Sequence, residues 1–281
     1  MMKKHKKQYH KVRKCVDGPN FSGQHLMHNK QILKSIVKQA DIKSTDLVMD
    51  IGAGKGALTF PLAEKAKKVL AVENDPVFSE ILSRKASGFS NIHIIERDFL
   101  MVHLPKEPFC VVANVPYAIT TPILKKLLNR PDTAFQRAVL TIEKGAAKRF
   151  TANTITNPLI LRWRMWFNIE ITMAISRENF SPPPKVDSAL IRIQRKKNPL
   201  VEHKYHSKLA SLAEYGLKYP HLPIHDVLKG IFTAPQMKQL IKNMRVKRDA
   251  PISSLKEHQW GVVFNTMIQY VEPYRWPKMK R

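Results

Sequence analysis

The sequence predicts an α/β fold with a seven-stranded, mostly parallel, doubly wound sheet, followed by a small all-helical domain. Short apolar runs alternate with helical stretches up to about residue 195, and helices separated by prolines replace them after residue 203. Parallel strands need crossover connections, so this alternation is typical of a sheet with helices on both faces. With 281 residues, 43% of them hydrophobic, the chain is long and apolar enough to build a substantial core.

The elements before residue 196 follow in chain order. Residues 1–14 form a basic tail with seven Lys or Arg and no acid. Met27–Ala40 has apolar side chains at the spacing of one helical face. Pro76–Ala86 is a further helix, with Asp75 as its N-cap and Pro76 at its first position. The seven strand candidates are Leu47–Ile51, Val69–Val72, Ile92–Ile95, Phe109–Ala113, Val139–Ile142, Ile169–Ile175 and Ala189–Ile193.

A charged, proline-ended linker begins at Arg195, and it places a domain boundary near residues 196–203. Beyond it, prolines at 220, 223, 235 and 251 separate short helical stretches. The expected helices are Tyr205–Leu217, Ile224–Phe232, Gln236–Met244 and Leu255–Tyr270. We therefore divide the chain into the tail at 1–14, a sheet domain at 15–197 and a helical domain at 204–281.

The charge of the chain is positive and uneven. Lys and Arg number 48 against 22 Asp and Glu, a formal net charge of +26. The tail holds +7, residues 15–143 have 16 basic and 13 acidic residues, and residues 144–281 have 25 and 9. An excess gathered at both ends indicates a polyanionic partner. Nucleic acid is favoured over a membrane, because the basic stretches lack the apolar helix face that interfacial binding requires.

The remaining composition indicates a cytoplasmic protein. Cys15 and Cys110 are the only cysteines, without the paired spacing of a zinc or redox site. No window approaches the ~18 apolar residues of a membrane span, and no apolar stretch follows the N-terminal lysines as in a signal peptide. We expect a monomer that has no metal site and no membrane segment.

A glycine-rich loop, Asp50-Ile51-Gly52-Ala53-Gly54-Lys55-Gly56, follows the first strand. Glycines let the backbone turn tightly and approach a ligand. The third glycine of a dinucleotide fingerprint would stand at position 57, which is Ala57, and the Lys-Ser/Thr ending of a P-loop is absent. The loop alone is therefore a weak signal.

Acidic residues strengthen this signal. Glu73 ends the second strand, where a carboxylate can accept both ribose hydroxyls of a nucleoside, and Asp98 follows the third strand within reach of an adenine amino group. With Asp50, these acids are expected at one edge of the sheet. Three carboxylates would repel the pyrophosphate of NAD, so the pattern favours S-adenosylmethionine. The alternative is that Glu73 and Asp98 are ordinary solvated acids.

The tetrapeptide Asn114-Val115-Pro116-Tyr117 ends the fourth strand and suits the methylation of an exocyclic amine. Such an amine is a poor nucleophile, and an Asn oxygen together with a proline-stiffened backbone carbonyl can accept its two hydrogens and align it. Tyr117 can stack on the base, and Phe180, in a proline-rich loop, can supply the opposite face. The alternative is an ordinary turn with two core aromatics.

Three further patterns have competing interpretations. Lys144, Lys148 and Arg149 fit phosphate contacts on one helix, or a solvated helical face. The run Arg162–Phe167 interleaves basic and aromatic residues like a stacking platform, but its spacing favours a core helix. His25 and His28 could share a helical face as metal ligands, but no acid or thiol joins them.

These motifs resemble, in order and spacing, the rRNA adenine N6-dimethyltransferases. The match covers nearly the whole chain, and Ala147-Lys148-Arg149-Phe150 makes it most similar to the Erm methyltransferases. That resemblance implies a Rossmann-like class I methyltransferase fold, S-adenosylmethionine as cofactor, and methylation of one adenosine in 23S rRNA, with resistance to macrolides, lincosamides and streptogramin B. The alternatives are a KsgA-like enzyme of small-subunit rRNA and a non-catalytic RNA-binding protein on the same scaffold.

The resemblance also implies roles for particular residues. Asn20 and Ser22 would contact the cofactor with Gly52, Gly54, Glu73 and Asp98, while Asn114 would contact both the cofactor and the target amine. Tyr117 and Phe180 would hold the adenine. Independently of the resemblance, their positive charge makes Lys144, Lys148, Arg149 and Lys185 the expected RNA-binding residues. Pro19 and Asp50 stand where family members often have Gln and Glu, so their roles stay open.

Overall fold

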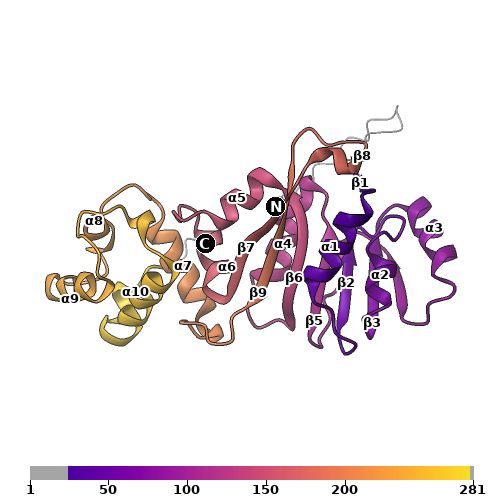
Figure 1. The fold of residues 1–281 in the computed structure, drawn as a ribbon. Coiled ribbons are helices and arrows are strands. Elements are labelled where there is room, and N and C mark those ends of the chain that lie inside the picture. Colours follow the sequence, from indigo (N-terminus) through magenta and orange to yellow (C-terminus); the bar gives the residue numbers. More distant parts are fainter. Residues whose placement is uncertain (1–24, 279–281) are drawn as a thin grey trace, which may run out of the picture.

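The computed structural model describes residues 25–278 and contains a seven-stranded sheet with the strand order β4-β3-β2-β5-β6-β9-β7 (Figure 1). All seven predicted strands are confirmed, most of them with one or more residues added at an end. They are β2 (Leu47–Ile51), β3 (Lys68–Glu73), β4 (Ile92–Glu96), β5 (Phe109–Asn114), β6 (Phe135–Glu143), β7 (Phe167–Ile175) and β9 (Ser188–Arg195). β2 to β6 run parallel, whereas β9 is antiparallel to both β6 and β7, so the sheet is mostly parallel as predicted.

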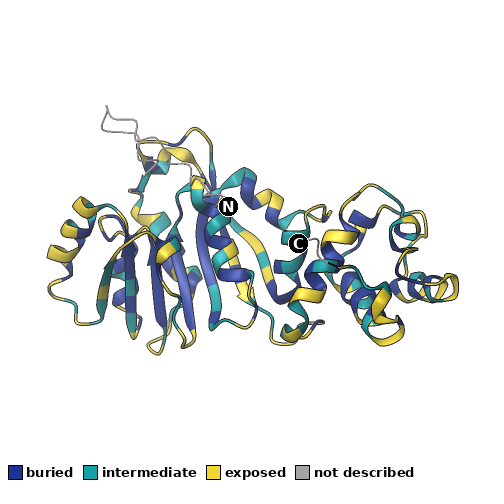
Figure 2. Cartoon of the chain, turned by 180° about the vertical axis from the view of Figure 1, so that it is seen from behind, coloured by how far each residue is buried: buried dark blue, intermediate teal, exposed yellow. Residues whose placement is uncertain are grey.

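The two faces of the sheet carry separate apolar clusters. In β5, Phe109, Val111 and Ala113 belong to one cluster, and Cys110 and Val112 belong to the other, as the alternation of a strand requires. Figure 2 shows the strands at the centre of the sheet as buried. The helices of this part are α1 (Lys30–Ala40), α2 (Thr59–Ala63), α3 (Pro76–Ala86), α4 (Thr120–Leu128), α5 (Lys144–Thr151) and α6 (Pro158–Trp166).

Helix α3 has the predicted bounds and cap, but α1 begins later than predicted. The Asp75 carboxylate accepts from the backbone N–H of Val77 at 2.9 Å. The predicted start of α1 at Met27 is wrong, because Asn29 caps the helix and Leu26–Met27 forms a short strand, β1. This strand pairs with β8 (Phe180–Ser181), a contact between distant segments that local periodicity cannot reveal.

The C-terminal helices pack against the end of the sheet domain that holds α6 (Figure 1). They are α7 (His206–Gly216), α8 (Ile224–Leu228), α9 (Ala234–Met244) and α10 (Glu257–Tyr270). The prediction of a helical region is confirmed, but α8 stops at Leu228 rather than Phe232, because the glycine at position 230 has a low helix propensity. One apolar cluster continues from the sheet into these helices.

The aromatic residues of α6 belong to that core. Trp163 and Trp166 are fully buried, and their indole N–H groups donate to Asn129 Oδ1 and to the Val201 carbonyl, each at 2.8 Å. The core interpretation of residues 162–167 is therefore confirmed over the stacking platform.

Candidate active site

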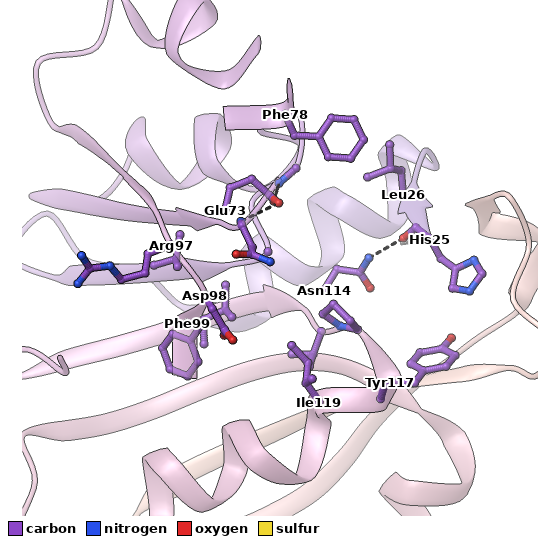
Figure 3. Close-up of a pocket in the computed structure, with 18 of the residues that line it drawn as sticks. His25, Leu26, Glu73, Phe78, Arg97, Asp98, Phe99, Asn114, Tyr117 and Ile119 are labelled. Atoms are coloured by element: carbon purple, nitrogen blue, oxygen red, sulfur yellow. Dashed lines mark hydrogen bonds between the residues drawn. The ribbon is translucent and has the colours of Figure 1, made fainter. Parts of the chain in front are cut away.

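A cavity of about 290 Å³ opens at the carboxyl ends of β2, β3 and β5 (Figure 3). In an open α/β sheet this edge is where ligands bind. The cavity brings together predicted residues that are far apart in the sequence: Gly52, Gly54, Glu73, Asp98, Asn114, Tyr117 and Phe180. Asn20 and Ser22, predicted to contact the cofactor, lie outside the described residues, as does Pro19.

The loop after β2 turns sharply at its glycines. Gly52 has a φ of 72°, in the left-handed region that favours glycine, and its N–H donates to the Val72 carbonyl at 2.8 Å. Gly56 has a φ of 87°, and a Cβ atom built on it would stand 2.2 Å from Phe60 Cε2. A glycine is therefore required at position 56, one residue earlier than in a dinucleotide fingerprint.

Glu73 organises the backbone around the cavity. Its side chain is 4% exposed. Oε2 accepts from the Gly54 N–H at 2.7 Å, and Oε1 accepts from the N–H groups of Asn74 and Asp75 at 2.9 Å each. The carboxylate therefore ties the glycine loop to the end of β3, and carboxylate oxygens have capacity for further donors from a ligand.

Asp98 begins the short 3₁₀ turn Phe99–Met101 beside the same cavity. One carboxylate oxygen accepts from the Leu100 N–H at 2.8 Å. The other oxygen makes no hydrogen bond to any residue of 25–278, and Asp98 itself is exposed. Figure 3 shows its carboxylate within the cavity region, where it can accept from a ligand.

The expectation that Asp50 joins Glu73 and Asp98 at the cavity is wrong. Asp50 is 1% exposed, does not line the cavity, and accepts a hydrogen bond from Thr59 Oγ1 at 2.7 Å. Burial raises the pKa of its carboxyl to about 7, against the lowering effect of the Thr59 bond. Its side chain bonds to the first residue of α2, beyond the glycine loop, a contact that the sequence pattern of the loop did not reveal.

The buried Asp50 predicts a pH-dependent stability. An unfolded Asp ionises near its ordinary pKa of 3.8, but the folded carboxyl ionises only at about 7. The contribution of the Asp50 carboxyl to the free energy of unfolding is therefore fully present below the unfolded pKa. It falls as the pH rises toward 7 and is then constant. We expect Asp50→Asn to unfold at a higher urea concentration than the parent at pH 8, and by a clearly smaller margin at pH 5, which lies between the two pKa values. Each pKa unit is worth about 1.4 kcal/mol.

Glu96→Gln is the control for that experiment, since Glu96 ends β4 and is exposed. In this variant, the difference in unfolding stability between pH 5 and pH 8 should stay close to the parental difference. An Asp50→Asn protein whose gain in stability is the same at both pH values would contradict the prediction.

The acceptor motif forms the other wall of the cavity. Asn114 Nδ2 donates to the His25 carbonyl at 2.9 Å, and the Tyr117 hydroxyl shares a hydrogen bond with Ser188 Oγ at 2.6 Å. Burial raises the pKa of the Tyr117 phenol above its ordinary value. Phe180 lines the cavity from β8 but is 2% exposed. The motif therefore presents an amide, a phenol ring and a largely covered second ring.

The predicted cations lie beside this wall. One shallow depression is lined by three of them, Lys144, Lys148 and Lys185, together with Arg177. The sequence interpretation missed Arg177, although this residue precedes Phe180 by only three positions. Arg149 is exposed on the same helix, α5, but does not line the depression. Lys144 Nζ lies 3.4 Å from Asp187 Oδ2, and hydrogen bonds from the Arg177 N–H and Lys144 hold the pKa of Asp187 below its usual range.

The two histidines considered as metal ligands bind backbone carbonyls. His25 Nδ1 lies 2.7 Å from the Pro182 oxygen, and His28 Nε2 lies 3.2 Å from the Glu178 oxygen. His25 also lines the cavity, and the sequence interpretation missed that role because it treated both residues only as a pair of ligands.

The fold and this cavity define the class of protein as a Rossmann-like class I methyltransferase. The Ribosomal RNA adenine dimethylase family model matches residues 19–269. The chain belongs to this family.

Relatives resemble the chain over its full length. Two proteins named rRNA adenine N-6-methyltransferase, from Bacillus licheniformis and Bacillus anthracis, are each 52% identical over 281 residues, which is 100% of this chain and 98% of each relative. The crystal structure of the 23S rRNA methyltransferase ErmE superposes with a TM-score of 0.79 at 27% identity, covering 87% of this chain and all of that one. The resemblance to Erm-type rRNA adenine methyltransferases is thereby confirmed.

Within residues 25–278, no helix combines the length and apolarity needed to span a membrane.

Proposed function

We propose that the protein methylates adenine N6 of a specific adenosine in 23S rRNA, using S-adenosylmethionine, and thereby confers resistance to macrolides, lincosamides and streptogramin B. The observation that carries this proposal is the Asn114-Val115-Pro116-Tyr117 motif in the wall of the cavity that Glu73 and Asp98 also line. The full-length similarity to rRNA adenine N-6-methyltransferases and the likeness to ErmE support the substrate.

The cavity residues fit the proposed cofactor. The Glu73 carboxylate accepts from three backbone N–H groups and has lone pairs left for ribose hydroxyls. The Asp98 oxygen that has no partner among residues 25–278 suits an adenine amino group. The left-handed backbone at Gly52 leaves no side chain in the way, so this loop would hold the methionine portion of the bound cofactor. When bound, S-adenosylmethionine supplies a methyl group activated by its sulfonium.

The acceptor residues position the target amine. Asn114 Nδ2 is engaged by His25, so Asn114 Oδ1 is the amide end available to accept one N6 hydrogen. The Pro116 carbonyl accepts from the Ile119 N–H at 3.1 Å, whereas the Val115 carbonyl has no hydrogen-bond donor within the described part of the chain. We assign the second N6 hydrogen to Val115. Together these acceptors align the nitrogen for attack.

The aromatic residues hold the adenine. A base must leave its stack to enter the cavity, and stacking on aromatic rings returns about 1–3 kcal/mol per base. Tyr117 offers its ring beside Asn114. Phe180 is covered in the free protein, so its contact with the base is restricted to the part of the ring that borders the cavity.

RNA binding is assigned to the basic residues outside the cofactor site. Lys144, Lys148 and Lys185 border the acceptor wall, Arg149 stands on the same helix as two of them, and residues 204–281 add further positive charge. These residues contact phosphates and orient the RNA without reading its sequence.

The charge distribution predicts a strong salt dependence of RNA binding. If about six phosphates are contacted, log affinity should fall with log salt at a slope of roughly −4 to −5. Cofactor affinity, measured by calorimetry in the same buffers, should change little, because the cofactor site is in the near-neutral region 15–143. A flat salt dependence of RNA affinity would contradict the assignment.

Radiolabelled cofactor tests the proposed function directly. The protein is incubated with naked 23S rRNA and, separately, with naked small-subunit rRNA, and the labelled nucleoside is identified after digestion. We expect N6-methylated adenosine in 23S rRNA only. Labelling restricted to small-subunit rRNA would favour a KsgA-like enzyme. Cofactor binding without labelling of either RNA would favour a non-catalytic RNA-binding protein.

A further inference from the structure

His25 joins two parts of the proposed acceptor site. Its backbone carbonyl accepts from Asn114 Nδ2 at 2.9 Å, and its ring Nδ1 lies 2.7 Å from the Pro182 carbonyl oxygen (Figure 3 shows the first bond). A carbonyl oxygen only accepts hydrogen bonds, so Nδ1 carries a proton and donates it. One residue therefore connects the side chain of Asn114 to the loop after Phe180.

The carbonyl of His25 determines which end of the Asn114 amide is free. An amide has an oxygen that accepts and a nitrogen that donates. With Nδ2 directed at the His25 carbonyl, Oδ1 is left for another partner. If the amide rotated by 180°, Oδ1 would face the His25 oxygen, and two acceptors would oppose each other. The position of this carbonyl therefore selects the orientation that can accept a hydrogen from a target amine.

The ring of His25 fixes the position of that carbonyl. His25 precedes β1, which has only two residues and pairs with β8. Because a two-residue strand pairing constrains its neighbours only weakly, the backbone position of His25 depends on the contacts of His25 itself. The Nδ1–H bond to Pro182 is such a contact, and the ring also lies 6.0 Å from the Tyr117 ring, centroid to centroid.

We propose that His25 is a positioning residue, whose ring N–H bond to Pro182 holds the carbonyl that orients Asn114. The proposal rests on the proposed transfer of methyl to adenine N6, in which Asn114 Oδ1 accepts a hydrogen of the amine.

His28 provides a matched control from the same strand-paired segment. Its ring Nε2 lies 3.2 Å from the Glu178 carbonyl, and its backbone N–H donates to the Asn179 carbonyl at 3.1 Å. It therefore docks on the turn before β8, whereas His25 contacts Pro182 after β8, and it makes no hydrogen bond to Asn114. Loss of its ring should loosen that turn without changing the Asn114 amide.

The experiment compares His25→Ala, His25→Asn, His25→Gln and His28→Ala at saturating cofactor and rRNA. Asn places Nδ2 where His places Nδ1, because both atoms are bonded to Cγ, whereas the Gln donor is one bond farther out. Loss of one such hydrogen bond should lower kcat by about five- to tenfold in His25→Ala and His25→Gln. His25→Asn and His28→Ala should stay within about twofold of the parent.

A second readout needs no activity. In ¹⁵N-edited NMR spectra of the free protein, the Asn114 side-chain amide is assigned by its absence in Asn114→Ala. We expect this signal to move in His25→Ala but not in His25→Asn or His28→Ala. If the parent methylates no rRNA, the proposed function fails, and this signal still decides on the role of His25.

Three results would overturn the proposal. One is a parental kcat in His25→Ala. Another is an equal loss of kcat in His25→Ala and His25→Asn, which would assign the effect to ring packing on Tyr117. The third is an Asn114 side-chain amide signal whose chemical shift is the same in His25→Ala as in the parent.

Discussion

Asn114→Ala is expected to lower methyl transfer to adenine by 100-fold or more while cofactor still binds. The substitution removes the Oδ1 acceptor for one hydrogen of the target amine, together with the bond to the His25 carbonyl. Misplacement of a reacting group by about 1 Å can cost ~10²-fold in rate. The measurement is single-turnover transfer of labelled methyl to rRNA, with cofactor affinity measured by calorimetry on the same protein.

Asn129→Ala serves as the control for this variant. Asn129 follows α4 and accepts from the Trp163 indole, away from the cavity, so it is a second Asn whose oxygen bonds within the protein. Its loss should reduce thermal stability and leave transfer per folded molecule unchanged. Full transfer by Asn114→Ala would remove Asn114 from the proposed mechanism.

Glu73→Ala is expected to weaken cofactor binding by about 100-fold or more. Three backbone N–H groups lose their acceptor, and the glycine loop loses its bond to the end of β3. A buried donor without a partner costs about 1–3 kcal/mol, and a hydrogen bond to a charged group contributes about 1.5–3 kcal/mol. Titration of S-adenosylmethionine by calorimetry measures the loss.

Glu96→Ala is the matched control for Glu73. The two glutamates are backbone partners in the parallel pairing of β3 and β4, but Glu96 is exposed and does not line the cavity. Cofactor affinity should therefore be parental in Glu96→Ala. An equal loss in both variants would indicate general destabilisation of the sheet edge rather than a role of Glu73 in the cofactor site.

Much of the fold follows from local sequence patterns. The seven apolar runs are all strands, and Asp75 with Pro76 begins α3 where capping chemistry predicts. Failures occur where distant segments meet. Leu26–Met27 continues the apolar spacing of α1 but pairs instead with Phe180–Ser181, and Asn29 takes the cap.

In the candidate site, too, some residues lie where the sequence predicts them and others do not. Glu73, Asp98 and Asn114 were predicted at the ends of their strands, and parallel strands bring such ends to one edge, so they meet at the cavity. Asp50 stands in the same local pattern, yet it is buried against Thr59. The direction of a side chain at the end of a strand depends on the register and on the loop that covers it, and the sequence pattern contains neither.

The sequence by itself determined the order of strands and helices, the glycine loop, the acceptor motif and the uneven charge, because each depends on neighbouring residues. Only the tertiary structure decided that His25 orients Asn114 and reaches Pro182, 157 residues away in the chain. It also decided that Arg177 joins Lys144, Lys148 and Lys185, and that Phe180 is covered. These contacts depend on hydrogen bonds and packing between segments that are remote in sequence, which composition and periodicity do not encode.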